Sequence, residues 1–344
     1  MTNRQQLLES IAKTSSDYRS YDLAAPTLDH VDRWISQFDR AVQLPILAEL
    51  DHVLKRTYFS MVDVTGFLSS LLKTKSLVGN DPCAFWKSAN FLDIQQGGNS
   101  QREMLALFSE LLAENCNCCV RDCGKGTMDF IYLDDAVFTG NRVRRDIEAW
   151  IAEHAPNKAN LHIISIALHS GGKYYADEYI SSAMRAAGKE ISVTWYSSKE
   201  LEDRRTYNYS SDVLRPTEIP AIQEVQAYVN EMTYKPTLRQ PGHVGRNGFF
   251  SGEDGRSLLE RELLIAGVRI RQMCPNLGVT QRPLGHISLE TLGFGSLIVT
   301  FRNCPNNAPL ALWVGDPWYP LFPRTTNRQT AHRRMIESFM KGDA

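Results

Sequence analysis

Two adjacent acids, Asp134 and Asp135, directly follow the apolar run Phe130-Ile131-Tyr132-Leu133. Such a run predicts a buried strand of a parallel sheet, and open α/β sheets bind ligands where their strands end. Thr139-Gly140-Asn141-Arg142 then predicts a turn into a helix, whose first N–H groups can hold a phosphate. A carboxylate pair beside an anion site suits a ligand with both a phosphate and neighbouring hydroxyls, such as a ribose 5-phosphate.

A second candidate anion site is Gly97-Gly98-Asn99-Ser100. It lies between a short predicted strand at 89–94 and an amphipathic helix that carries apolar residues from 104 to 112. The glycines permit close backbone approach, and the following helix start favours anions, to which Arg102 would add charge. The competing interpretation is an ordinary glycine turn capped by Ser100 or Asn99.

The acidic pair has three other interpretations. A P-loop NTPase needs Gly-x4-Gly-Lys-Ser/Thr upstream, and the chain has no such motif before Phe130. A phosphatase-type nucleophile usually lies in Asp-x-Asp, which Asp134-Asp135 is not. The third interpretation, two carboxylates that only cap the next helix, stays open because acids at a helix start are favourable on electrostatic grounds alone.

The surrounding pattern predicts an α/β fold in three parts. Residues 1–85 form a helical N-terminal region, 86–205 an α/β core, and 206–344 an α+β C-terminal extension. Strands that alternate with helices indicate a parallel sheet covered on both faces. Core strands are expected at 116–120, 130–133, 161–168 and 191–196, with helices at 142–152 and 177–187. In the extension, helices are expected at 219–231 and 257–266, and strands at 295–301 and 310–314.

Composition narrows the class of protein. The 38 basic and 39 acidic residues give a net charge of −1, which argues against a protein that mainly coats nucleic acid. No apolar run approaches the length of a membrane span, and the polar start MTNRQQLLES does not resemble a secretory signal. Because the seven cysteines are an odd number and four crowd between 116 and 123, we expect a cytoplasmic protein with mostly reduced thiols.

The crowded cysteines also invite a zinc interpretation. Structural zinc commonly takes two separated ligand pairs, and no second pair accompanies Cys116-x-Cys118-Cys119-x3-Cys123. Adjacent residues on the strand expected there would point to opposite faces. Buried thiols acting as small apolar groups are therefore favoured.

Residues 130–142 resemble the signature of type I phosphoribosyltransferases: an apolar strand, two acids, three further residues, then Thr-Gly. More broadly, the chain from Trp34 to Arg324 is similar to phosphoribosyltransferase-like proteins of bacterial conflict and antiviral gene clusters. The matching segments are Trp34-Ile35-x2-Phe38, Gly97-Gly98-Asn99-Ser100-Gln101, Leu292-Gly293-Phe294-Gly295-Ser296, Asn303-x-Pro305-Asn306-Asn307-x-Pro309-Leu310 and Trp318-Tyr319-Pro320-Leu321-Phe322.

The resemblance implies a type I phosphoribosyltransferase-like sheet and a glycosyltransferase that acts on phosphoribosyl pyrophosphate (PRPP) or, in reverse, on a nucleotide. Asp134 and Asp135 would be catalytic and contact the ribose hydroxyls, and Thr139, Gly140, Asn141 and Arg142 would hold the 5-phosphate. Gly97, Gly98, Asn99 and Ser100 would bind pyrophosphate. Magnesium would accompany the substrate with few protein ligands. A partner protein from the same gene cluster or a second copy of the chain is a further expectation, in the context of antiviral defence.

The chain also departs from the type I pattern. The loop that closes over substrate in many relatives falls between Val120 and Phe130 and is short here, so the alternative function is a non-catalytic sensor or regulatory subunit. The stretch Lys235–Gly255 is either a second lid or, preferably, a solvated connector. His169 and Lys173 follow a predicted strand and either contact the acceptor or serve only the turn.

The C-terminal aromatic residues leave a third class of function open, that of a scaffold which docks a partner protein. Trp313, Trp318, Tyr319 and Phe322 lie close together in the sequence. They could stack a base or dock a partner protein, and a role in the core is the default.

Overall fold

A computed structural model describes residues 3–324 of the chain, apart from 97, 125, 127 and 275. The chain forms two compact units. One combines Met1–Met61 with Glu202–Ala344, and the other is Val62–Leu201. Residues 62–85, which the sequence assigns to the N-terminal region, belong to the same unit as the sheet. The division of the chain into three domains stays a prediction.

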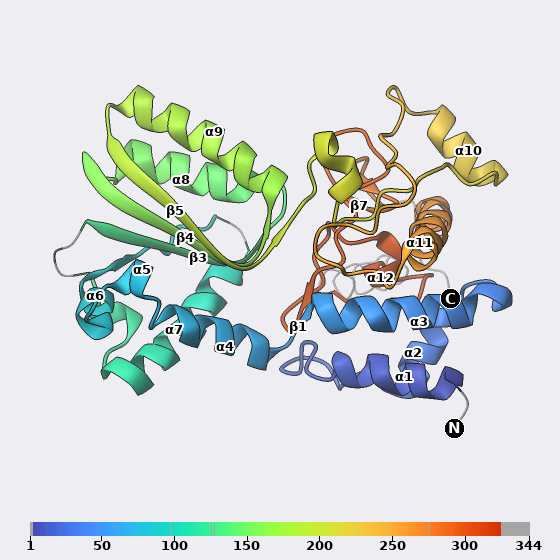
Figure 1. The fold of residues 1–344 in the computed structure, drawn as a ribbon, viewed down its shortest axis with the longest axis horizontal. Helices are drawn as coiled ribbons and strands as arrows, with labels where there is room; N and C mark the ends of the chain where they lie inside the picture. Colours follow the sequence, from blue (N-terminus) through green and yellow to red (C-terminus); the bar gives the residue numbers. More distant parts are fainter. Residues whose placement is uncertain (1–2, 97, 125, 127, 275, 325–344) are drawn as a thin grey trace, which may run out of the picture. The chain divides into compact units, whose positions relative to one another are not determined.

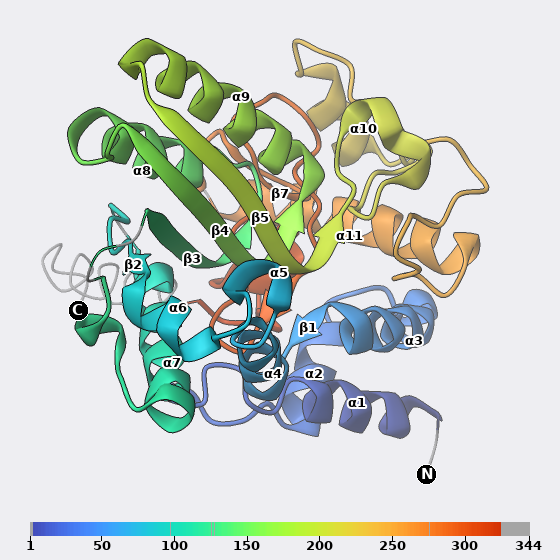
Figure 2. The ribbon, with the colours of Figure 1, turned by 60° about the vertical axis from the view of Figure 1, so that its left-hand side comes forward.

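The unit Val62–Leu201 is built on a parallel sheet with the strand order β2-β3-β4-β5 (Figure 2). The strands are β2 (Asn90–Phe91), β3 (Asp129–Val137), β4 (Lys158–His169) and β5 (Glu190–Leu201). The crossovers between the last three strands are the helices α8 (Asn141–Glu153) and α9 (Ser170–Ala187). This arrangement confirms the predicted α/β class with a parallel sheet and flanking helices.

Helices α8 and α9 cover one face of the sheet (Figure 1). Residues paired in register on parallel strands point to the same face, so Tyr132, Ile163 and Trp195 form one row beneath the helices. Helix α8 buries Val143, Ile147, Trp150 and Ile151, a spacing that places all four on one side. Each large apolar side chain buried in this way stabilises the fold by about 1.5–3 kcal/mol.

Helices α6 (Pro82–Ser88) and α7 (Ser100–Cys116) lie beside the other face, after α4 (Met61–Leu71) and α5 (Lys75–Val78) (Figure 1). Trp86 of α6 is fully buried and packs edge-on against Phe108 of α7, with 4.8 Å between ring centroids. Its indole N–H donates to the Leu72 carbonyl oxygen at 3.2 Å. Trp86 therefore ties the chain after α4 to the sheet unit.

The other unit is mainly helical. It contains α1 (Asn3–Thr14), α2 (Leu28–Ile35), α3 (Arg40–Thr57), α10 (Gln223–Asn230), α11 (Glu253–Met273), α12 (Leu310–Trp313) and the 3-10 helix η2 (Arg205–Ser210). Its short strands are β1 (Tyr58–Phe59), paired with β8 (Val299–Thr300), and β6 (Gln281–Arg282), paired with β7 (Gly285–His286).

A cluster of tryptophans forms part of the core of this unit. The indole N–H groups of Trp34 and Trp318 both donate to the Ala311 carbonyl oxygen, at 2.8 and 2.9 Å. Trp313, Trp318 and Phe322 are buried, which confirms the core role expected for them.

Three sequence-based expectations of strands are wrong in whole or in part. Helix α7 runs through Cys116 and is followed by the 3-10 turn η1 (Val120–Asp122), so no strand lies at 116–120. Residues 310–313 form a helix turn after Pro309, and only Val299–Thr300 of 295–301 is a strand. Five of the seven cysteines are free thiols, in keeping with the expected mostly reduced state, and Cys83 and Cys116 form a disulfide where α6 and α7 pack together.

In the described part of the chain, no helix is long and apolar enough to cross a membrane.

Two glycines let the segments after β3 and β4 touch. A Cβ added at Gly140 would lie 2.0 Å from the Gly172 carbonyl oxygen, and one at Gly172 would lie 2.0 Å from the Phe138 carbonyl oxygen. Gly140 also has a φ of +71°, which favours glycine. The amino-terminal turns of α8 and α9 are therefore in direct backbone contact.

We predict that Gly172→Ala destabilises the protein by about 1–3 kcal/mol or more, because the new methyl group overlaps a backbone oxygen. Gly66→Ala is the matched control, since it lies inside α4 with nothing within 4 Å of the added atom. That change should stabilise the fold by up to about 1 kcal/mol, as alanine does in a helix interior. Urea unfolding of both variants checks the opposite signs, and equal effects would contradict the contact.

Candidate functional site

The two acids lie inside β3 instead of after it. The strand continues beyond Leu133 because Ala136 and Val137 still pair with β4. Successive side chains of a strand point to opposite faces, so Asp134 and Asp135 lie on different faces of the sheet. Asp134 is 2% exposed, whereas Asp135 is half-buried. The expectation that both carboxylates emerge at the strand end is therefore wrong.

Asp134 lies beneath the loop that follows β2. The Gln95 side-chain amide donates to its Oδ2 at 3.2 Å, the Asp135 N–H donates to its Oδ1 at 2.9 Å, and the Ser100 hydroxyl also hydrogen-bonds to it. Burial raises the pKa of Asp134 to about 7, and the Asp135 carboxylate adds to this rise. The Ser100 hydroxyl, the Asp135 N–H and the Arg142 charge act in the opposite direction on this pKa.

The loop itself is fixed by two glutamine side chains. Gln101 Oε1 accepts the N–H groups of Ile94 and Gln95 at 2.8 and 2.9 Å. Gln95 Oε1 accepts the Gln101 N–H at 3.2 Å, and the Gln95 amide donates to Ser100 Oγ at 3.1 Å. Ser100 is consequently buried and turned inward, while Gly98 and Asn99 are exposed. The exposed part of the predicted pyrophosphate loop is thus its glycine and asparagine.

Arg142 brings the two predicted loops together. Its guanidinium packs so closely on Gly98 that a Cβ added there would lie 3.2 Å from Nη1. Asp146, one helical turn later, accepts the Tyr132 hydroxyl at 2.8 Å and also the Gln96 N–H. Burial raises the pKa of Asp146, and these two hydrogen bonds oppose the rise. The loop after β2 is thereby attached to the first turns of α8.

The predicted phosphate loop begins α8. Gly140 is the N-cap residue in the left-handed region, Thr139 and Asn141 are half-buried, and Arg142 is exposed. The Arg144 guanidinium donates to Asn141 Oδ1 at 3.3 Å. Because the first N–H groups of a helix have no partner within the helix, this turn presents donors and the positive end of the helix dipole.

Of the other candidate residues, one lies outside the described part of the chain and the rest are paired or buried. Gly97 lies outside the described residues, and Arg102 forms an ion pair with Asp93 at 3.5 Å. His169 is fully buried, and its Nδ1–H donates to the Val137 carbonyl oxygen at 3.0 Å. Burial lowers the pKa of His169 to about 4, so it is neutral at pH 7. Lys173 is paired with Asp177 at 2.6 Å.

Within Lys235–Gly255, Arg239 is anchored in its own unit. It is 2% exposed, and its guanidinium pairs with Glu253 and Glu260 at 2.8 and 2.9 Å. Arg256 pairs with the same Glu260 at 2.8 Å. A buried pair of this kind fixes the chain, so Arg239 serves the fold of this stretch and is not available to a ligand.

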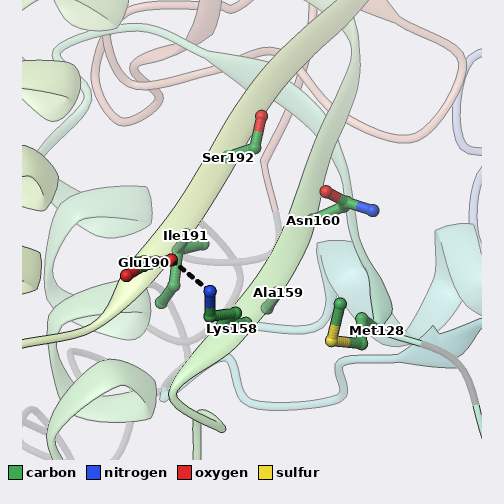
Figure 3. A pocket seen from close by; sticks show the side chains of 7 residues that line it. All are labelled: Met128, Lys158, Ala159, Asn160, Glu190, Ile191 and Ser192. Atoms are coloured by element: carbon green, nitrogen blue, oxygen red, sulfur yellow. Dashed lines mark ion pairs between the residues drawn. The ribbon is translucent and has the colours of Figure 1, made fainter.

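A separate hollow of about 410 Å³ lies at the opposite end of the sheet, where the strands begin (Figure 3). It is lined by residues at the amino-terminal ends of three strands, including Met128, Asn160 and Ser192. Lys158 and Glu190, which begin β4 and β5, form an ion pair across it at 2.8 Å. The hollow therefore belongs to the end of the sheet away from the candidate site.

Sequence reasoning missed Gln95, Gln101, Tyr132 and Asp146, which hold the site in place. Gln95 and Gln101 flank the glycine loop, so their polarity beside it was the available signal. Tyr132 and Asp146 meet only because β3 and α8 pack, and nothing in their spacing indicates the contact.

A parallel sheet with an acid-bearing strand, followed by a glycine-started helix and faced by a second glycine loop, defines a phosphoribosyltransferase-like α/β protein. The family model PRTase-CE matches residues 31–324, most of the chain, and the chain therefore belongs to this family. Neither the curated proteins nor the solved structures contain a match to the chain.

We predict that Asp134 makes the stability of the protein fall as pH rises. Its folded pKa of about 7 exceeds the value near 3.9 of an unfolded aspartate, so the folded state binds more protons between these values. Relative to Asp134→Asn, the wild type should lose up to about 1.4 kcal/mol per pH unit across this window. Urea unfolding from pH 4 to 8 measures the unfolding free energy of the wild type minus that of the variant, and a value that stays constant or rises with pH would refute the assignment.

Proposed function

We propose that the protein binds PRPP together with magnesium and transfers its 5-phosphoribosyl group to an acceptor, or runs the reverse cleavage of a nucleotide by pyrophosphate. The observation that carries the proposal is the contact between Arg142 and Gly98. It brings the two proposed anion-binding loops together at the end of the sheet where β3, the strand that carries Asp135, leads into α8. PRPP has an anion at each end of its ribose, which suits two such loops.

In this proposal the first turn of α8 holds the 5-phosphate. The backbone N–H groups after Gly140 and the hydroxyl of Thr139 donate to the phosphate, and the exposed Arg142 adds a charge-assisted hydrogen bond. The αL conformation of Gly140 lets the backbone turn directly into the helix.

The exposed residues Gly98 and Asn99 face the pyrophosphate in this arrangement. The positive φ of Gly98, +95°, turns the backbone where a side chain would strain it. Arg142 lies against this turn, so its charge is shared between the two loops. The chain thereby stabilises the negative charge that develops on the departing pyrophosphate.

The two acids have separate roles in the proposal. Asp135, half-buried on β3, accepts hydrogen bonds from the ribose hydroxyls, while Asp134 positions the loop through Gln95 and Ser100. A carboxylate at Asp135 also favours the positive charge that develops on the ribose ring as the bond to pyrophosphate breaks. No protein nucleophile is required for this chemistry.

The donor set fits magnesium that is carried by the substrate. Among the residues that the structure describes, no group of three or more His, Cys, Asp or Glu side chains could hold a metal ion. Magnesium commonly binds through substrate phosphates and water with one or two carboxylates, which Asp135 could supply. When bound, it would neutralise charge on the pyrophosphate.

The resemblance to proteins of bacterial conflict gene clusters extends the proposal to antiviral defence, in which the acceptor would belong to the infecting agent or to the host cell. Release of pyrophosphate identifies the acceptor when bases, nucleosides and nucleic acids are tested in turn.

A second candidate function is a sensor that binds PRPP without turnover. The observation that favours it is the anchoring of residues 119–124, in the segment where relatives carry a mobile loop. The Val120 N–H donates to Ser109 Oγ at 3.1 Å, and the Gly124 N–H donates to the Lys87 carbonyl oxygen at 3.2 Å. Tight binding without pyrophosphate release would favour this candidate, and measurable turnover would exclude it.

We predict that Asp135→Asn and Arg142→Ala each weaken the binding of PRPP with Mg²⁺ at least about tenfold, because each removes a charged hydrogen-bonding group. Isothermal titration calorimetry measures the affinity. Arg102→Ala is the matched control, since Arg102 is also a cation near the glycine loop but is 68% exposed and paired with Asp93. Unchanged affinity in both site variants, or an equal loss in the control, would contradict the proposed site.

A further inference from the structure

A row of planar side chains lies on the unit that combines Met1–Met61 with Glu202–Ala344. The Arg204 guanidinium lies over the Tyr207 ring, 4.4 Å from its centroid. The Tyr207 and Tyr209 rings meet edge to face with 6.4 Å between centroids, and 6.1 Å separates the Tyr209 and His243 rings. These distances are in the range of direct contact between aromatic rings. The proposed function uses none of the four side chains.

The row is open to solvent. Tyr207 is 39% exposed and Tyr209 is 47% exposed, and His243 is exposed as well. Single exposed aromatic side chains are ordinary on a protein surface, whereas neighbouring exposed rings commonly mark a binding site. The row therefore offers aromatic surface on which another planar group can stack.

The chain around the row holds it in place. The Nε and Nη2 groups of Arg204 donate to the two carboxylate oxygens of Glu202 at 2.9 and 2.6 Å. The Tyr207 N–H donates to the Arg204 carbonyl oxygen at 3.1 Å, and the Asn208 side-chain amide donates to the Leu238 carbonyl oxygen at 3.2 Å. Because these residues are already ordered, a ligand that stacks on them loses less free energy to ordering on binding.

Two arginines add positive charge beside the row. Arg205 is the first residue of η2, and the Arg246 N–H donates to the carbonyl oxygen of Ser210, the last residue of η2, at 3.1 Å. Both arginine side chains are exposed. The Arg204 charge is balanced by Glu202, so Arg205 and Arg246 are the cations that this surface presents to an anionic partner.

The residue types distinguish between classes of partner. Between 202 and 250, a range that the structure describes in full, every exposed large hydrophobic side chain is a tyrosine. A protein-docking surface has a more apolar core than this. Exposed aromatic rings beside cations are the combination that binds single-stranded nucleic acid, because bases stack on the rings and phosphates pair with the cations. A duplex keeps its base faces within its own stack.

We propose that this surface binds single-stranded nucleic acid, with bases stacked on the tyrosine rings and phosphates held by the two exposed arginines. It consists of Arg204, Arg205, Tyr207, Tyr209, His243 and Arg246. The site lies beyond the proposed function and does not depend on it. Because few cations take part and the chain has a net charge of −1, the binding should be sensitive to salt.

Fluorescence anisotropy of a labelled oligothymidylate of about 12 nucleotides tests the proposal with the full chain. We expect saturable binding that weakens as the salt concentration rises. An abasic strand of equal length keeps the phosphates but has no bases to stack, and it should bind at least about fivefold more weakly. A duplex of equal length should also bind at least about fivefold more weakly.

Variants of the row locate the binding site. Tyr209→Ala should weaken the binding of the single strand at least about fivefold, whereas Tyr209→Phe should preserve it because the ring remains. Arg246→Ala should weaken binding and make its salt dependence shallower, since one phosphate contact is lost. Tyr234→Ala is the matched control, because Tyr234 is a 70% exposed tyrosine of the same unit that is not part of the row.

Circular dichroism of each variant confirms that it is folded. Four results would overturn the proposal: no saturable binding of the single strand, equal affinity for the abasic strand or the duplex, unchanged affinity in Tyr209→Ala, or an equal loss in Tyr234→Ala. Binding of the abasic strand as tight as that of the oligothymidylate would mean that charge alone attracts the strand.

Discussion

The candidate site depends on a carboxylate buried under a loop of amide side chains. Asp134 cannot be reached by solvent, and its oxygens accept hydrogen bonds from Gln95, Ser100 and the backbone. A buried carboxyl group is costly unless it is hydrogen-bonded or neutral, so the loop must stay in place over it. The same interaction that satisfies the acid therefore fixes the loop that carries Gly98.

A second tie joins this loop to the helix after β3. Asp146 accepts hydrogen bonds from β3 through Tyr132 and from the loop through Gln96. Arg142 also packs on Gly98. Strand β3, the loop after β2 and helix α8 are therefore held together by polar contacts. Such networks are worth more together than as separate pairs, since each bond orients the next. The position of the loop over Asp134 follows from this mutual support.

The sequence was sufficient to predict the parallel sheet and the order of its helices, because apolar runs and periodic helices are local signals. It placed Thr139, Gly140 and Arg142 at a helix start, where the structure has them. It could not show that β3 continues through Asp134 and Asp135, since that extension depends on pairing with β4. The division of the two acids between opposite faces follows from this pairing and not from their residue types.

The same limit explains why the sequence did not predict the disulfide. Cys83 and Cys116 are 33 residues apart, and only the packing of α6 on α7 brings them together. The strand expected at 116–120 was also inferred from local apolar character, which does not distinguish the last turn of a helix from a short strand. Long-range contacts thus decided both the bonded cysteines and the shape of the turn after α7.

The contact between Gly140 and Gly172 has an electrostatic consequence. It places the amino termini of α8 and α9 side by side, so two positive helix ends repel each other at close range. Glu200, which accepts a hydrogen bond from the Ser170 hydroxyl at 3.2 Å, offsets part of this at α9. An anion bound between these two helix ends would reduce the remaining repulsion. Anion binding would therefore make this end of the sheet more rigid, and the effect would be largest at low salt concentration.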